Sequence, residues 1–97
     1  MKLENIIEEI HEDSNFSIHE VNEIYVILSS DISNEEKRDL IVPFLDSILV
    51  DCDKEIDSLN KEKYFDSSNS LQFASSLYEY RRISTNKLKT NILNLLK

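Results

Sequence analysis

The sequence contains no glycine and only one proline. Two-residue turns between antiparallel strands usually need glycine, because their backbone dihedral φ is positive. The missing glycines therefore argue against a β-rich sandwich or barrel. They also exclude phosphate-binding and dinucleotide-binding loops, which are built on glycine.

Cysteines and long apolar segments are also scarce. Cys52 is the single cysteine, so no internal disulfide can form, and this favours a reducing compartment. Residues 1–13 carry one lysine among several acids, which is not the pattern of a signal peptide. No apolar run approaches the roughly 20 residues that cross a bilayer. We expect one cytoplasmic domain, residues 1–97, without a membrane contact.

Basic residues are outnumbered, and the formal net charge is −8. This balance argues against binding nucleic acid through its phosphates and against binding an anionic membrane face. The charge is uneven: residues 1–66 carry 18 acidic and 6 basic side chains, whereas residues 67–97 carry 5 basic side chains and one acid, Glu79. We expect the last segment to neutralise part of the acid and the remainder to face solvent or a partner.

The first 30 residues predict two amphipathic helices. The first has apolar residues at i, i+3, i+4 and i+7, which are Leu3, Ile6, Ile7 and Ile10. The second starts at a capping box, Ser17 with Glu20, flanked by Phe16 and Val21 as a hydrophobic staple. It should run to about Ser30, and its predicted inward residues are Ile18, Val21, Ile24, Tyr25 and Leu28. A buried strand at residues 24–28 is the competing prediction, but the cap favours the helix.

A third helix is predicted after a second capping box, Ser33 with Glu36. Apolar residues from Leu40 to Leu59 keep helical spacing for about five turns. Pro43 lies inside this pattern, where it removes a hydrogen bond and clashes with the preceding turn. We expect a kink there, or a break into a short and a long helix.

The polar stretch 64–70 predicts a linker before the last helical segment. That segment has apolar residues at Leu71, Ala74, Tyr78, Leu88, Ile92 and Leu95. Arg81 and Thr85 fall on the same face, so either one helix places them at an edge or residues 83–86 break it in two. The segments together predict an all-α antiparallel bundle of four helices, or five if the last is broken.

The segment "DCDKEIDSLNKE", residues 51–62, has the acidic spacing of an EF-hand calcium loop. Position 6 of that loop must be glycine for its sharp turn, and here it is Ile56. At about 100° per residue the acids instead form two edges of one helix. One edge holds Asp46, Asp53 and Asp57, and the other holds Asp51, Glu55 and Glu62. We therefore expect no calcium site and no other cofactor.

Catalytic patterns are equally incomplete. His19 begins an H-E-x-x-H motif, but Glu23 stands where the second zinc ligand should be. His11 with Glu8 gives one E-x-x-H, whereas di-iron bundles need two. Cys52 lies on the apolar face. No serine stands at a spacing from a histidine that would indicate a catalytic pair. We expect exposed histidines and no enzymatic activity.

Acidic ridges combined with aromatic residues suit a basic protein partner, because charge speeds encounter and buried aromatics carry affinity. Tyr80 falls off the apolar face and is the candidate surface anchor. The alternative interpretation is that the acidity only provides solubility.

With "EEIHEDSNFSIHEVNE" (residues 8–23) and "LDSILVDCDKEID" (residues 45–57) on two helices, the chain resembles bacterial toxin immunity proteins. These small acidic cytoplasmic proteins are paired with colicins and contact-dependent growth-inhibition toxins. The resemblance covers size, charge and helicity. It implies one-to-one binding to a basic toxin domain, often a nuclease, whose nucleic-acid surface is covered by acidic residues. The predicted contacts are Asp46, Asp53, Asp57, Glu20, Glu23 and Tyr80. A structural or adaptor bundle that associates with itself or with other helices is the alternative.

Overall fold

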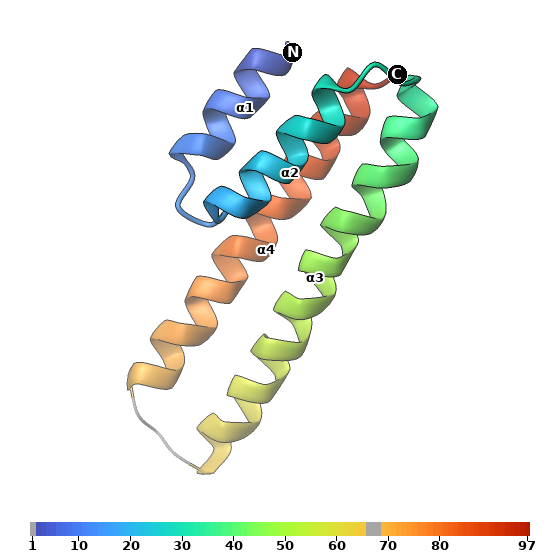
Figure 1. The fold of residues 1–97 in the computed structure, drawn as a ribbon. Helices are drawn as coiled ribbons and strands as arrows, with labels where there is room; N and C mark the ends of the chain where they lie inside the picture. Colours follow the sequence, from blue (N-terminus) through green and yellow to red (C-terminus); the bar gives the residue numbers. More distant parts are fainter. Residues whose placement is uncertain (1, 66–68) are drawn as a thin grey trace.

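The computed structural model describes residues 2–65 and 69–97, with side chains for residues 2–61 and 73–97. This part of the chain forms four α-helices and no strand (Figure 1). They are α1 (Leu3–Glu12), α2 (Ile18–Ser29), α3 (Asn34–Phe65) and α4 (Asn69–Leu95). The all-α bundle predicted from the sequence is confirmed.

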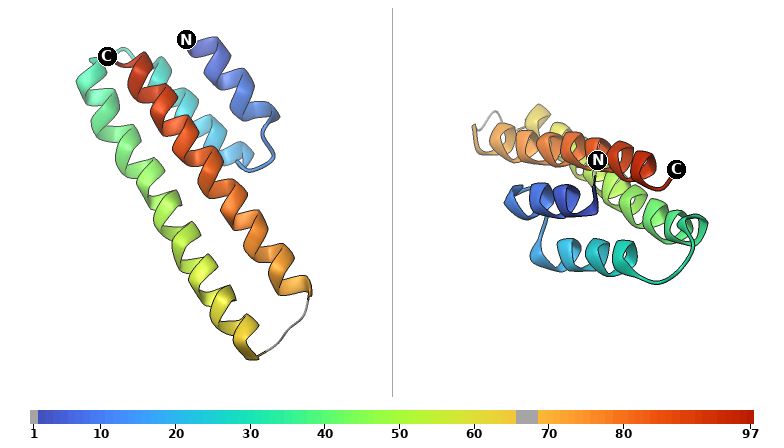
Figure 2. Two further views of the ribbon diagram at one scale, coloured as in Figure 1. Left: turned by 180° about the vertical axis from the view of Figure 1, so that it is seen from behind. Right: turned by 90° about the horizontal axis from the view of Figure 1, so that it is seen from above.

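The helices form two layers of unequal length. α3 and α4 lie antiparallel and make the most extensive contact of the bundle, and α1 and α2 lie together on one face of this pair (Figure 2). At 1.5 Å per residue, the 12-residue α2 spans about 18 Å and the 32-residue α3 about 48 Å. The short helices therefore cover only one end of the long pair. We call the covered part the four-helix end and the remainder the two-helix end.

The predicted capping box at Ser17 starts α2, and of the second predicted box the Ser33 side-chain cap starts α3. The Ser17 hydroxyl accepts a hydrogen bond from the Glu20 N–H at 3.1 Å, and the Glu20 carboxylate accepts one from the Ser17 N–H at 3.0 Å. Ser33 accepts likewise from the Glu36 N–H at 3.1 Å. Residues 24–28 are helical, so the competing strand is wrong.

Pro43 does not interrupt α3, which continues from Asn34 to Phe65 as one helix (Figure 1). The predicted break is therefore wrong, and a bend of the helix axis at Pro43 stays a prediction. Both Pro43 and Asp39 are exposed. The Asp39 carbonyl, which loses its helical partner to the proline, can therefore bond to water.

α4 is one helix, and residues 83–86 do not break it. The predicted linker at residues 64–70 is too long, because α3 extends through Phe65 and α4 begins at Asn69. Its centre, residues 66–68, lies outside the described residues.

The main hydrophobic core lies where the four helices meet. Its members are Ile6, Ile10, Phe16, Val21, Ile24, Ile27, Leu28, Ile41, Leu45, Ile48, Cys52, Leu88, Ile92 and Leu96. The predicted inward positions of Ile18 and Tyr25 are wrong, since these side chains are 74% and 51% exposed. Both lie about 100–120° around the helix from Ile24. Ile27 is buried instead, on the opposite flank.

Candidate functional site

The four basic side chains of α4 each pair with an acid on another helix. The pairs are Arg81–Glu20 on α2 at 2.5 Å, Arg82–Asp53 on α3 at 3.2 Å, Lys87–Glu9 on α1 at 2.9 Å and Lys89–Asp46 on α3 at 2.7 Å. The last segment thus neutralises part of the acid of all three preceding helices, as its charge predicted. The positive charge of α4 is therefore used in contacts within the molecule.

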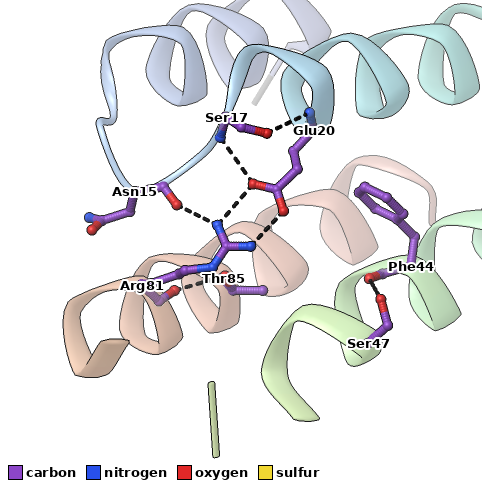
Figure 3. A network of polar contacts seen from close by, with 7 residues as sticks. All are labelled: Asn15, Ser17, Glu20, Phe44, Ser47, Arg81 and Thr85. Carbon is purple, nitrogen blue, oxygen red and sulfur yellow. Dashed lines mark hydrogen bonds and ion pairs between the residues drawn. The ribbon is translucent and has the colours of Figure 1, made fainter. Parts of the chain in front are cut away.

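The Arg81–Glu20 pair is the most buried of these contacts (Figure 3). Arg81 donates to both carboxylate oxygens of Glu20, at 2.8 and 2.5 Å, and to the Asn15 carbonyl at 2.6 Å. The buried Thr85 hydroxyl donates to the Arg81 carbonyl at 2.8 Å. The hydrogen bond from Arg81 holds the pKa of Glu20 below its usual range, although partial burial opposes the shift. The same pair raises the pKa of Arg81.

This network fixes the α1–α2 turn and the start of α2 against α4. Glu20 caps α2 and neutralises Arg81 with one carboxylate, and its side chain is only 17% exposed. The structure therefore places this predicted partner contact inside the fold. Its role is to position helices.

The other predicted acids lie on one edge of α3, as expected from the helical spacing. Asp46 and Asp53 face α4 in the pairs with Lys89 and Arg82, and Asp57 pairs with Lys61 one turn further along α3 at 3.1 Å. Asp53 and Asp57 remain largely open to solvent, and Asp46 is about half exposed. However, each of the three carboxylates is partly neutralised by an ion pair.

Glu23 and Tyr80 are both exposed, and within the described residues neither side chain makes a hydrogen bond or an ion pair. Glu23 lies on α2 and Tyr80 on α4. These two are the predicted contacts whose side chains remain entirely available to a partner.

Acidic side chains without a basic partner are spread over the solvent-exposed faces of the helices. In the described part of the chain, the exposed carboxylates outside any ion pair are Glu4, Glu8, Glu12, Glu23, Asp31, Glu35, Glu36, Asp39, Asp51, Glu55 and Glu79. Over residues 2–61 and 73–97, the exposed basic side chains outside any ion pair are Lys2, Lys54 and Lys97. The surface therefore keeps a strong negative field after folding.

An apolar line runs along α4 at the two-helix end. Phe73, Leu77 and Tyr80 are 67%, 50% and 62% exposed and are spaced i, i+4, i+7, so they lie on one side of the helix. Ser84 continues this spacing and accepts a hydrogen bond from Asn15 at 3.1 Å. The α1–α2 turn thus covers this side of α4 at Ser84. The apolar line is exposed from Tyr80 towards the N-terminus of α4, through Leu77 to Phe73.

A matching acidic line runs along α3. Lys37 donates to the Leu28 carbonyl at 2.9 Å, so its side of α3 faces α2. Asp51 and Glu55 follow on the same side, about four and five turns later, with exposed side chains. The sequence placed them on one edge together with Glu62, whose side chain lies outside the described residues. Neither Asp51 nor Glu55 makes an ion pair within the described part of the chain.

Phe73 and Leu77 were not among the sequence candidates. Their signal was their spacing with Tyr80, on the side of the helix away from Tyr78. This spacing alone does not show whether the three side chains are buried or exposed, because that depends on how far α1 and α2 extend over α4.

Chemical groups for catalysis or metal binding are few among the described residues. No group of three or more His, Cys, Asp or Glu side chains there could hold a metal ion. Residues 51–62 are helical, so they do not form an EF-hand loop. Both histidines are exposed, as predicted. Cys52 is buried, and burial raises the pKa of its thiol.

A hollow of about 250 Å³ lies between α1 and α4. Its charged residues are used locally, because Glu9 pairs with Lys87 and Asp13 accepts two hydrogen bonds from Asn15. No helix in the described ranges is long and apolar enough to cross a membrane. No family model, curated protein or solved structure matches this chain.

Proposed function

We propose that this chain is a small acidic binding protein that holds a basic protein partner one-to-one, in the manner of an immunity protein. The partner is a toxin domain, of the nuclease type, whose nucleic-acid surface would be occluded. The observation that carries the proposal is the acid that remains unpaired after all four basic side chains of α4 have found internal partners.

The physical route is electrostatic attraction followed by apolar contact. A negative surface speeds the encounter with a positive one, and the effect weakens as salt screens both. Aromatic side chains that become buried then slow dissociation. The exposed Tyr80 together with the free carboxylates supplies both components on one molecule.

The alternative is an adaptor bundle that associates with copies of itself. The observation that favours it is the number of large apolar side chains at least half exposed, among them Tyr25, Val26, Leu40 and Val50. Charge opposes it, because each copy carries a net −8.

The test is co-expression with the protein encoded by the adjacent reading frame. We expect that protein to be basic, to arrest growth alone, and to lose this effect when the acidic chain is present. Sedimentation should then show a one-to-one complex. A harmless neighbour, or a toxic one that neither binds nor is neutralised, would contradict the proposal. A stable homo-oligomer without a partner would favour the adaptor.

A further inference from the structure

We propose that the two-helix end docks an amphipathic basic helix of the partner, on a surface formed by Asp51 and Glu55 of α3 and Phe73, Leu77 and Tyr80 of α4. We call this surface the open face. The inference rests on the proposed function for the class of partner and adds the surface and the form of the bound segment.

The first step is that the open face continues the covered face. α2 contacts both long helices, through Glu20 with Arg81 and through Leu28 with Lys37. The apolar line of α4 extends from Ser84, which Asn15 of the α1–α2 turn contacts, and the acidic line of α3 extends from the side of Lys37. By these contacts the two lines lie on the two flanks of the face of the α3–α4 pair that carries α1 and α2. Figure 2 shows the two short helices on that face.

The second step is the register of the two lines. The pairs Asp46–Lys89 and Asp53–Arg82 show that seven residues forward on α3 correspond to seven residues back on α4. Two residues beyond Asp53, Glu55 is therefore level with Tyr80. The acidic and apolar lines therefore start at the same level along the bundle axis, next to the N-terminal end of α2.

The third step is the shape of the occupant. At the four-helix end, the inner face of the long pair is covered by two helices with apolar residues at helical spacing. At the two-helix end, Phe73, Leu77 and Tyr80 present the same spacing without cover. A helix with apolar residues at i, i+3 or i+4, and i+7 fits such a line.

The fourth step is the charge of the occupant. Asp51 and Glu55 have no ion pair among the described residues, so a docked helix needs Lys or Arg on the flank that faces α3. A second copy of this chain would instead bring equal charges together, since each carries a net −8. The complementary occupant is therefore a basic amphipathic helix.

The experiment titrates the full ¹⁵N-labelled chain with a synthetic helical peptide of about 18 residues, or five turns. The peptide has leucines on one face and lysines on the flanks. A second peptide has the same composition in scrambled order, and a third has glutamate in place of lysine. We expect amide shifts concentrated at residues 51–55 and 73–80 with the first peptide, and at least tenfold weaker binding with the other two.

Two double variants test the two halves of the open face. Phe73→Ser with Leu77→Ser, and Asp51→Asn with Glu55→Gln, should each weaken binding of the lysine peptide about tenfold or more. The matched controls change equally exposed residues elsewhere: Tyr25→Ser with Val26→Ser on α2, and Glu4→Gln with Glu8→Gln on α1. These should change the dissociation constant less than twofold. Circular dichroism and thermal unfolding check that every variant folds.

Several outcomes would overturn the inference. They are shifts centred on α1 or α2, equal binding of the scrambled peptide, equal losses in the controls, or no binding. A concentration-dependent dimer abolished by the Phe73 and Leu77 changes would make the face a self-association surface instead. If the basic neighbour binds the Phe73 and Leu77 variant as tightly as the wild type, the docking surface is wrong and the proposed function stands. If no basic protein binds the wild-type chain, the proposed function itself fails.

Discussion

The two ends of this molecule are built from the same two long helices but differ in what covers them. At the four-helix end, α1 and α2 bury a continuous apolar core and bring Glu9 and Glu20 to basic residues of α4. At the two-helix end, apolar and acidic side chains on the equivalent face remain exposed. The main hydrophobic core is therefore concentrated at one end, and the exposed apolar and acidic side chains of this face lie at the other.

The largest expected difference between the ends concerns core truncation. Leu45→Ala at the four-helix end should lower the free energy of unfolding by about 3–4 kcal/mol, because Leu45 is fully buried and its neighbours cannot fill the cavity. Ile56→Ala at the two-helix end should cost about 1–2 kcal/mol, since solvent can reach the site more easily. Urea unfolding measures both. Equal losses would show that the two ends are equally packed.

The next largest effect concerns the ion pair that anchors α2. Glu20→Gln should lower the free energy of unfolding by about 1–2 kcal/mol, because Arg81 loses its charged partner in a partly buried site. Glu23→Gln, one turn further along α2 and exposed, is the matched control and should change stability by less than about 0.5 kcal/mol. If both variants lose the same amount, the pair does not anchor the helix.

The same pair predicts a pH dependence. The pKa of Glu20 is lowered from its ordinary value of 4.5 in the folded chain, so the unfolded state binds this proton first as pH falls. The stability that Glu20 contributes is fully present above pH 4.5 and is lost as pH falls through the lowered pKa. The stability difference between wild type and Glu20→Gln should therefore shrink below pH 4.5. A difference that stays constant down to pH 2 would contradict this assignment.

The smallest effect is expected at the exposed edge of α3. Asp53→Asn removes the pair with Arg82, which is open to solvent, and should cost about 0.5 kcal/mol. Adding salt to the wild type should erase most of this difference. A cost comparable to that of Glu20→Gln would mean that this edge also stabilises the fold.

Local features of this fold were readable from the sequence, and contacts between distant segments were not. The Ser17–Glu20 capping box was predicted because its members are three residues apart. The second role of Glu20 was missed, because Arg81 lies 61 residues away. The fully buried Thr85 is explained by its bond to the Arg81 carbonyl within one unbroken helix.

The rotation of α2 about its axis, and the length of α3 and α4 that α1 and α2 cover, decide which of the remaining apolar side chains are buried. Ile18 and Tyr25 were assigned inward because their spacing fits a helix face, but Val21, Ile24, Ile27 and Leu28 fill that face. Phe73 and Leu77 fit an apolar pattern equally well, yet they are exposed because α1 and α2 end before reaching them. The spacing of apolar residues identifies one face of a helix. Whether another helix packs on that face is known only from the arrangement of the helices in the structure.

The most direct test is the association rate constant of the chain with the proposed basic partner as ionic strength rises. We predict that the rate falls at least tenfold between about 0.05 and 0.5 M salt, and that the Asp51→Asn, Glu55→Gln variant shows a smaller fall. The Glu4→Gln, Glu8→Gln variant controls for net charge alone. A rate that does not change with salt, or an identical salt dependence in all three chains, would contradict the assignment of recognition to the acidic side of the two-helix end.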